Sequence, residues 1–196
     1  MKDITELVII IDRSGSMHGL EKDVIGGFNS LIEEQRKEEG ETLVTTIFFN
    51  QDVKFIHERI DINNIKKLDG RSYIPSGCTA LLDAIGNAIG FIKGRHAKLD
   101  EKELPKHTIF SIMTDGLENA SKEYSYSQIK NMIKLQKKSG WDFMFQAANI
   151  DTEYEADRLG IDRDMANSFD ATEEGCRHQM KMACCMIGKA RRKCKN

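Results

Sequence analysis

The sequence predicts an α/β fold: a Rossmann-like, doubly wound and mostly parallel sheet with one antiparallel edge strand and helices on both faces. Two observations predict it. Apolar runs typical of strands alternate along the chain with segments whose apolar residues recur at helical spacing. Several runs, such as residues 7–11, are continuously apolar, which is typical of strands buried on both faces of a parallel sheet. Strands of that kind need helices packed over both faces.

Each predicted element has a local signal. The run at 7–11 is rich in β-branched residues, and helical spacing follows it, with Gly40 as the expected helix stop. A turn at 50–52 should fold the third strand back antiparallel to the second. Ser125 and Gln128 form a capping box for a helix that Gly140 ends. Strands are predicted at 7–11, 43–49, 53–60, 108–114, 141–148 and 166–169, and helices at 20–32, 81–92, 125–136, 153–159 and 172–194.

Two helices carry a further pattern. Gly86, Gly90 and Gly94 are spaced four apart, and we expect them to let the helix backbone pack closely on the sheet. Apolar residues of the last helix fall on one side at helical spacing, so that side should pack on the sheet. These residues are Met180, Ala183, Cys184, Ile187 and Cys194.

Length and composition limit the class of protein. We expect residues 1–196 to form a single domain, since α/β folds of this length commonly do. The 31 acidic residues against 29 basic ones give a formal charge of −2, which disfavours a nucleic-acid binder that uses its whole surface. The apolar run near the N-terminus is too short for a secretory or membrane segment, and the five cysteines show no CxxC spacing. We therefore expect a cytoplasmic protein with reduced thiols and no membrane partner.

Three loops at predicted strand ends or helix starts carry oxygen-bearing side chains. Asp12, Ser14 and Ser16 come directly after the first strand, and alternate residues of such a segment can point toward one place. Gly15 lets the backbone turn between the two serines. Thr79 stands at a helix start, and Asp115 follows the fourth strand. Because ligands of doubly wound folds bind at the carboxyl ends of the strands, this edge is where we expect chemistry.

Two carboxylates and three hydroxyls make an all-oxygen set, which hard divalent cations such as Mg²⁺ or Mn²⁺ prefer. For the first loop alone, turn formation and capping of the next helix explain Asp12, Ser14 and Ser16 equally well. The loops of Thr79 and Asp115 favour the metal interpretation, because each lies where an α/β sheet would supply a ligand.

The pattern Asp-x-Ser-x-Ser, then Gly-x-Thr, then Thr-Asp-Gly resembles the metal-ion-dependent adhesion site of von Willebrand factor type A domains. The matching residues are Asp12, Ser14, Ser16, Thr79 and Asp115, in the family's order. The resemblance implies a Mg²⁺ or Mn²⁺ site at the upper edge of a Rossmann-like sheet. It also implies a protein partner whose Asp or Glu carboxylate binds the metal. Without a secretory or membrane segment, the chain looks more like the stand-alone intracellular type A proteins of microbes than like the adhesive members.

Alternatives remain open. A magnesium-dependent phosphohydrolase could use Ser14 or Ser16 with His18, although the chain has no G-x-S-x-G or P-loop pattern. The basic stretch 189–195 could contact RNA weakly, or its positive charges could interact favourably with the dipole at a helix C-terminus. An EF-hand loop would need glycine where Met17 stands. The spacing of Cys176, His178, Cys184 and Cys185 fits no zinc pattern.

Overall fold

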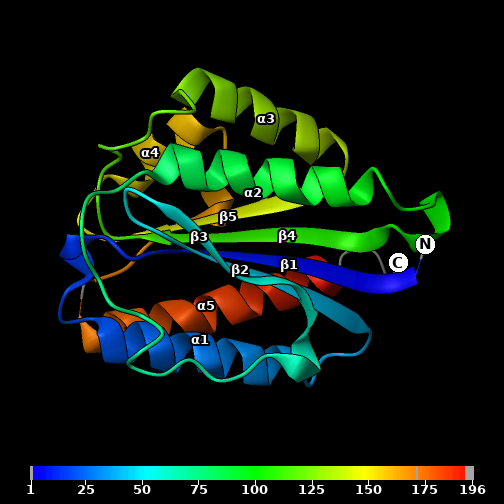
Figure 1. Ribbon diagram of the computed structural model, residues 1–196, viewed down its shortest axis with the longest axis horizontal. Coiled ribbons are helices and arrows are strands. Elements are labelled where there is room, and N and C mark those ends of the chain that lie inside the picture. The colour runs from blue at the N-terminus through cyan, green and yellow to red at the C-terminus, as the bar shows by residue number, and fades with distance from the viewer. Residues whose placement is uncertain (1, 171, 193–196) are drawn as a thin grey trace.

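A computed structural model describes residues 2–170 and 172–192, except for the side chains of residues 2, 173, 174, 176–181 and 192. Its six-stranded sheet has the order β3-β2-β1-β4-β5-β6 (Figure 1). All neighbouring strands are parallel except β3, which pairs antiparallel with β2 at one edge. The predicted fold class is confirmed. The strands are β1 (Lys2–Asp12), β2 (Glu41–Phe49), β3 (Val53–Asp61), β4 (Pro105–Thr114), β5 (Trp141–Ala147) and β6 (Ala166–Ser168).

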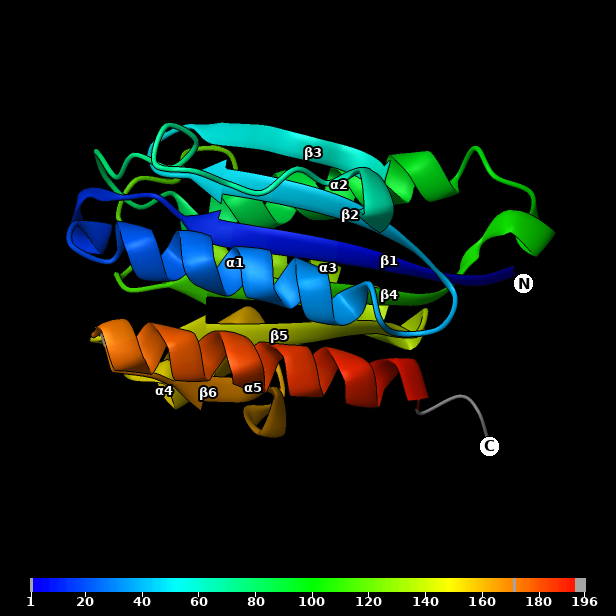
Figure 2. The same ribbon diagram turned by 90° about the horizontal axis from the view of Figure 1, so that it is seen from below.

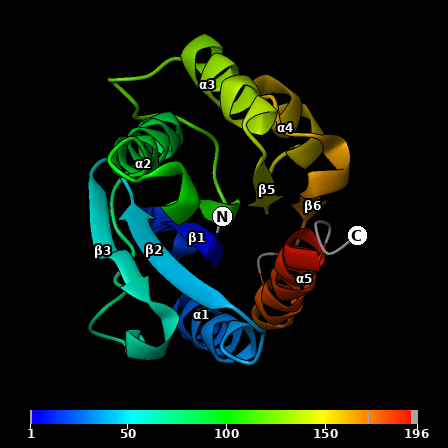
Figure 3. The same ribbon diagram turned by 90° about the vertical axis from the view of Figure 1, so that its right-hand side faces the viewer.

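Helices cover both faces of the sheet, as the view along the strands shows (Figure 3). α1 and α5 lie side by side on one face (Figure 2), and α2, α3 and α4 lie on the other. Seen from below, the start of β1 and the end of α5 lie on the side opposite the arrowheads of the parallel strands β1 and β2 (Figure 2). The helices are α1 (Glu21–Gln35), α2 (Leu81–His96), α3 (Tyr126–Lys138), α4 (Thr152–Leu159) and α5 (Glu173–Arg192).

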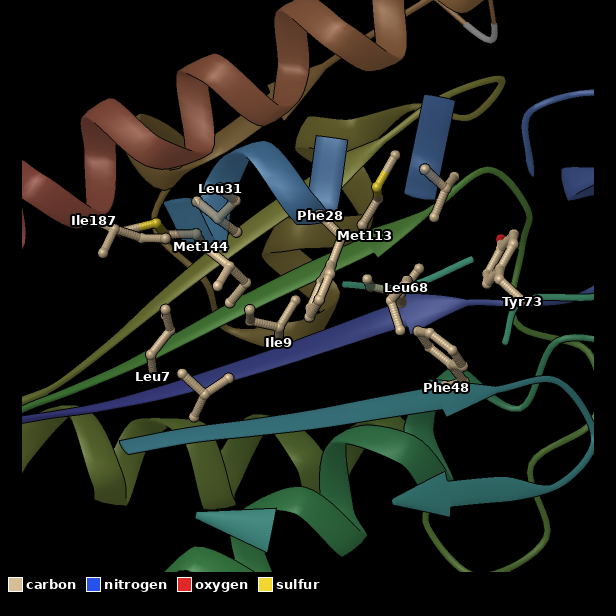
Figure 4. Packing of buried hydrophobic residues seen from close by; sticks show 14 of the residues in the cluster. Leu7, Ile9, Phe28, Leu31, Phe48, Leu68, Tyr73, Met113, Met144 and Ile187 are labelled. Carbon is tan, nitrogen blue, oxygen red and sulfur yellow. The ribbon is translucent and has the colours of Figure 1, made fainter. Parts of the chain in front are cut away.

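β1 is buried on both faces because it lies between β2 and β4 in the middle of the sheet. Leu7 and Ile9 pack with Phe28 of α1 on one side (Figure 4), and Val8 and Ile10 pack under α2 and α3 on the other. This explains the continuous apolar run. The strand begins earlier than predicted, at Lys2, since parallel pairing with both neighbours extends it through polar residues.

Two glycine predictions were wrong. Gly86 does not face the sheet: a Cβ there would lie 2.5 Å from the ring of Tyr124, while Gly90 and Gly94 have nothing within 4 Å of such an atom. Gly40 does not stop the first helix, which ends at Gln35, where the apolar spacing gives way to charged residues. It instead leads into β2 with φ +92, so close to Asp3 that a Cβ would lie 2.9 Å from the Asp3 carbonyl oxygen.

The capping box of α3 is confirmed, with Ser125 and Gln128 each satisfying the other's backbone N–H. On α5, Ala183 and Ile187 are buried and Cys184 packs against the same core, as predicted. The side chains of Met180 and Cys194 lie outside the described residues. Within residues 2–170 and 172–192, no helix combines the length and the apolar character needed to cross a membrane.

Candidate metal centre

The carboxyl ends of β1 and β4 lie together because the two strands are parallel neighbours (left side of Figure 1), and three loops bring the five candidate residues to this end of the sheet. Asp12 is the last residue of β1, and Asp115 follows the last residue of β4. Ser14 and Ser16 lie in the turn between β1 and α1, and Thr79 stands two residues before α2 begins. Side chains far apart in sequence therefore meet at the carboxyl ends of two adjacent strands.

Asp12 is fully buried, and both its carboxylate oxygens accept hydrogen bonds. The backbone N–H of Ser14 donates to Oδ1 at 2.7 Å, and the Thr114 hydroxyl donates to Oδ2 at 2.6 Å. The Tyr73 hydroxyl donates to the Asp12 carbonyl oxygen at 2.5 Å. The orientation of this residue is thus fixed from three sides. The sequence reasoning missed the roles of Thr114 and Tyr73, although Thr114 stood in the Thr-Asp-Gly pattern as a signal.

A chain of hydroxyls joins the first loop to Asp115. The Oγ atoms of Ser14 and Ser16 are 3.0 Å apart, and the Ser16 hydroxyl donates to Asp115 Oδ1 at 2.5 Å. Asp12, Ser14 and Asp115 are buried, whereas Ser16 is exposed. The oxygen set therefore extends from the end of the sheet to the surface, where a ligand could reach it.

Glycines allow the loops to come this close. A Cβ on Gly116 would lie 3.3 Å from Ser16 Oγ and 3.4 Å from Thr79 Oγ1, so both hydroxyls border this residue. The Gly15 N–H donates to the carbonyl oxygen of Gly77 at 2.9 Å, and a Cβ on Gly15 would lie 3.3 Å from that oxygen. Gly15 has no positive φ. The backbone does turn here, in the 3₁₀ turn Gly15–Met17, but it needs no positive φ, and the role of Gly15 is the close approach between the two loops.

The turn-and-cap explanation of the first loop accounts for Asp12 only. Its carboxylate accepts from the Ser14 N–H two residues on, as a turn-forming Asp does. Ser14 precedes the short 3₁₀ turn Gly15–Met17 but makes no side-chain cap hydrogen bond, and the residue that caps α1 is Leu20. The serine hydroxyls contact each other and Asp115 instead.

The two carboxylates have no positive partner among the described side chains. Burial raises the pKa of Asp12 above its ordinary value; hydrogen bonds from Thr114 and Ser14 oppose this, and the negative Asp115 adds to it. Burial also raises the pKa of Asp115, against the hydrogen bond from Ser16. Among the described side chains, no Lys, Arg or His forms an ion pair with either one. Two adjacent buried carboxylates are costly without a cation, so the residues present fit a bound divalent ion.

The donor set is built from oxygen alone. In the described part of the chain, no three His, Cys, Asp or Glu side chains gather as a metal-binding group. That result agrees with a site whose remaining donors are hydroxyls. Oxygen donors alone are a poor match for soft metals, which prefer sulfur and imidazole ligands.

The alternative chemistries find little support in the geometry. His18 is exposed, and its Nδ1 lies 3.4 Å from Glu21 Oε1. In the basic stretch at the C-terminus, Arg191 is buried and donates to Gln35 Oε1 and to the Glu39 carbonyl oxygen. The side chains of Cys176 and His178 lie outside the described residues, so the geometry says nothing of a zinc ligand there.

Comparison with known proteins gives the fold. No family profile matches the sequence, and no curated protein matches it. Among solved structures, the von Willebrand factor domain of the type V pili tip protein Mfa5 from Porphyromonas gingivalis matches with a TM-score of 0.68 at 10% identity. The match covers 100% of this chain and 99% of that one. This chain has the von Willebrand factor type A fold.

Two further structures share this type A fold. A von Willebrand factor type A protein from Catenulispora acidiphila matches with a TM-score of 0.59 at 12% identity, over 92% of this chain and 42% of that one. Proximal thread matrix protein 1 from the mussel byssus, with its metal-ion-dependent adhesion site occupied by zinc, matches with a TM-score of 0.61 at 15% identity. That match covers 93% of this chain and 46% of that one, so the chain spans about half the length of the mussel protein.

Proposed function

We propose that this type A fold is a divalent-cation-dependent protein-binding module. The ion would be held by oxygens of Asp12, Ser14, Ser16, Thr79 and Asp115, and would bridge to an Asp or Glu carboxylate of a partner protein. The observation that carries the proposal is a pair of adjacent buried carboxylates without a cationic partner among the described side chains, next to two serine hydroxyls.

The chemistry of the donors explains why such an ion would bind an outside anion. Two carboxylates at most balance the charge of one divalent ion and three hydroxyls add no charge, so the loaded site would carry no excess negative charge that repels an outside anion. Mg²⁺ and Mn²⁺ are hard ions and keep exchangeable water in sites with few protein ligands. When bound, the ion supplies a positive centre at a surface opening, beside the exposed Ser16. A partner's carboxylate is a hard, anionic ligand suited to it.

Two exposed apolar side chains, which we propose form a rim to the site, favour a protein as the partner. Among the described residues, six large hydrophobic side chains are exposed, and two of them, Ile74 and Leu117, lie in the loops that carry Thr79 and Asp115. Ile74 follows Tyr73, which is bonded to Asp12, and Leu117 follows Gly116, which borders Ser16. Apolar side chains near such a polar centre would add buried area to a contact with a partner protein.

The structural neighbours agree with a binding role. The Porphyromonas match is a pilus tip protein and the mussel match is a thread matrix protein. The zinc in the mussel protein supports a divalent ion at the corresponding motif.

For the compartment we propose the cytoplasm, because the spacing of the cysteines does not suggest a disulfide framework. Among the described cysteines, Cys78, Cys184 and Cys185 are free.

Metal binding is the first test. Free Mn²⁺ is followed by electron paramagnetic resonance as metal-free protein is titrated with Mn²⁺. We expect binding in the wild type and its loss in Asp12→Asn and Thr79→Ala. The matched control is Asp151→Asn, because Asp151 caps α4 and asparagine caps a helix equally well. Binding that persists in Asp12→Asn would contradict the site.

A second test distinguishes a binding module from a phosphohydrolase. Wild type and Asp115→Ala are assayed for binding of aspartate-containing peptides and for hydrolysis of a generic phosphoester, with Mn²⁺ or with chelator. We expect chelator-sensitive peptide binding and no hydrolysis. Metal-dependent turnover that disappears in Asp115→Ala would favour the phosphohydrolase instead.

A further inference from the structure

The loop that follows Asp115 is tied to the backbone of Thr79, and Asn119 makes two of the three hydrogen bonds. The Thr79 N–H donates to Asn119 Oδ1 at 2.9 Å, and the Asn119 N–H donates to the Thr79 carbonyl oxygen at 3.0 Å. The Ala120 N–H reaches the same carbonyl at 3.2 Å. Both backbone polar groups of Thr79 are therefore held by the loop that begins at Asp115.

The same loop is anchored on the first turn of α2, beginning with Glu118. Ala80, which caps α2, makes no side-chain cap hydrogen bond. The Glu118 carboxylate provides the missing acceptor, since its Oε2 accepts from the Leu82 N–H at 3.0 Å. Its Oε1 accepts from two backbone N–H groups of its own loop. A carboxylate at a helix N-terminus also interacts favourably with the helix dipole.

Asp83 anchors the far end of the loop. Its carboxylate is buried and accepts from the backbone N–H groups of Lys122, Glu123 and Tyr124 at 2.8, 2.9 and 3.0 Å. The Tyr124 ring then packs where a side chain on Gly86 would otherwise stand. This contact explains why glycine stands at position 86, which the sequence pattern did not reveal.

These contacts divide the five candidate ligands into two groups. Asp12, Ser14 and Ser16 belong to the end of β1 and its turn, while Thr79 and Asp115 are joined by the loop around Asn119. Thr79 lies outside regular secondary structure. No helix or strand ladder fixes the direction of its hydroxyl, and its backbone is held on both sides by Asn119.

We propose that Asn119 is a positioning residue of the metal centre, which sets the Thr79 hydroxyl relative to Asp115 without itself touching the ion. This inference rests on the proposed function. Partners that orient metal ligands commonly matter about 10- to 100-fold for metal affinity. Asn119 is exposed, so shortening it leaves the hydrophobic core untouched.

Three variants test the role of Asn119. Asn119→Ala removes the Oδ1 acceptor, and Asn119→Asp keeps one. Asn87→Ala is the matched control: it removes hydrogen bonds of Asn87 to the Asp83 carbonyl oxygen and to Glu123 at the other end of the same loop. Mn²⁺ affinity is measured by electron paramagnetic resonance, and amide hydrogen exchange at Thr79 is measured in the metal-free protein.

We expect Asn119→Ala to bind Mn²⁺ about 10- to 100-fold more weakly and to exchange the Thr79 amide faster without metal. Asn119→Asp should restore amide protection and Mn²⁺ binding, and Asn87→Ala should resemble wild type in both. Unchanged Mn²⁺ affinity in Asn119→Ala would overturn the positioning role while leaving the proposed function intact. Absence of Mn²⁺ binding in wild type would instead overturn the proposed function, and unchanged Thr79 exchange would refute the tether itself.

Discussion

Strand β1 carries two fully buried acids six residues apart, and the fold treats them differently. Glu6, in the middle of the sheet, has the Arg59 Nε 2.8 Å and the His96 Nε2 3.4 Å from its Oε2. Asp12, at the end of the strand, accepts hydrogen bonds only from an amide and a hydroxyl among the contacts described, and its charged neighbour is a second carboxylate.

Arg59, the partner of Glu6, lies at an unusual backbone conformation. Arg59 has φ +52, unusual for a residue with a side chain, at an irregularity in the pairing of β2 and β3. Its N–H donates to Thr45 Oγ1, which fixes this conformation. One buried acid therefore has its positive partner within the fold, whereas the other lies in an oxygen-lined site that suits a cation from outside.

Removing Glu6 should have the largest effect on folding. Glu6→Ala leaves the mostly buried Arg59 unpaired, and we expect a loss of about 3–5 kcal/mol in the free energy of unfolding, with or without Mn²⁺. Glu58→Ala on the same strand as Arg59 is the control, because its pair with Arg95 is exposed and should contribute at most about 1 kcal/mol. Urea unfolding measures both. Equal losses would erase the contrast between a buried and a surface pair.

In contrast to Glu6→Ala, Asp115→Asn should leave the metal-free stability intact and abolish the stabilisation by Mn²⁺. It relieves the repulsion between two buried carboxylates, so the metal-free variant should be at least as stable as wild type. Stabilisation by Mn²⁺, about 2.7 kcal/mol at a hundredfold excess over Kd, should disappear. Thermal unfolding with chelator and with Mn²⁺ gives both quantities. A variant that is less stable without metal and still stabilised by Mn²⁺ would mean that Asp115 is structural, like Glu6.

Acid should weaken metal binding sooner than it would for ordinary carboxylates. Burial raises the pKa of Asp12 and of Asp115, and protons compete with the ion for the same oxygens. Affinity is therefore full above these raised values and falls as the pH drops through them. We expect the fall in Mn²⁺ affinity on acidification to begin at a higher pH than it would for carboxylates of ordinary pKa. Affinity that stays constant down to the ordinary range of aspartate would contradict the raised values.

The apolar rim should contribute least. Leu117 and Leu135 are equally exposed, at 58% and 59%, but Leu117 comes two residues after the candidate ligand Asp115, whereas Leu135 lies on α3. For a peptide with leucine next to aspartate, we expect Leu117→Ser to weaken Mn²⁺-dependent binding by about 1 kcal/mol, and Leu135→Ser to leave it unchanged. Fluorescence anisotropy measures the affinities. Equal effects at both positions would remove the rim from the binding surface.

Local patterns predicted most of the fold. The order of strands and helices followed from apolar spacing, and the capping box of α3 followed from Ser125 and Gln128. The helix stop at Gly40 was a local error, since α1 ends at Gln35, but the other misses concerned contacts between distant segments. Nothing near Gly86 in the sequence indicates that the Tyr124 ring lies against it, and nothing near Gly15 indicates the Gly77 carbonyl.

The candidate site was predictable for a related reason. Its five residues occur in three short motifs that can be recognised by their spacing. The groups that hold these residues in place could not be recognised in this way. Asn119 lies 40 residues from Thr79, and Thr114 lies 102 residues from Asp12. Such partners are exposed polar residues or strand ends of ordinary composition, which carry no periodic signal.

The alternation of elements, the two-sided burial of β1 and the oxygen chemistry of the three loops all follow from residue type and short spacing, so the amino-acid sequence was enough to predict them. Which buried acid has a cation depends on the folded arrangement, since Glu6 and Asp12 look alike along the strand. The charge of a buried carboxylate is compensated by whatever lies within a few ångströms of it. Here Arg59 and His96 reach Glu6 from β3 and α2, and no described cation reaches Asp12.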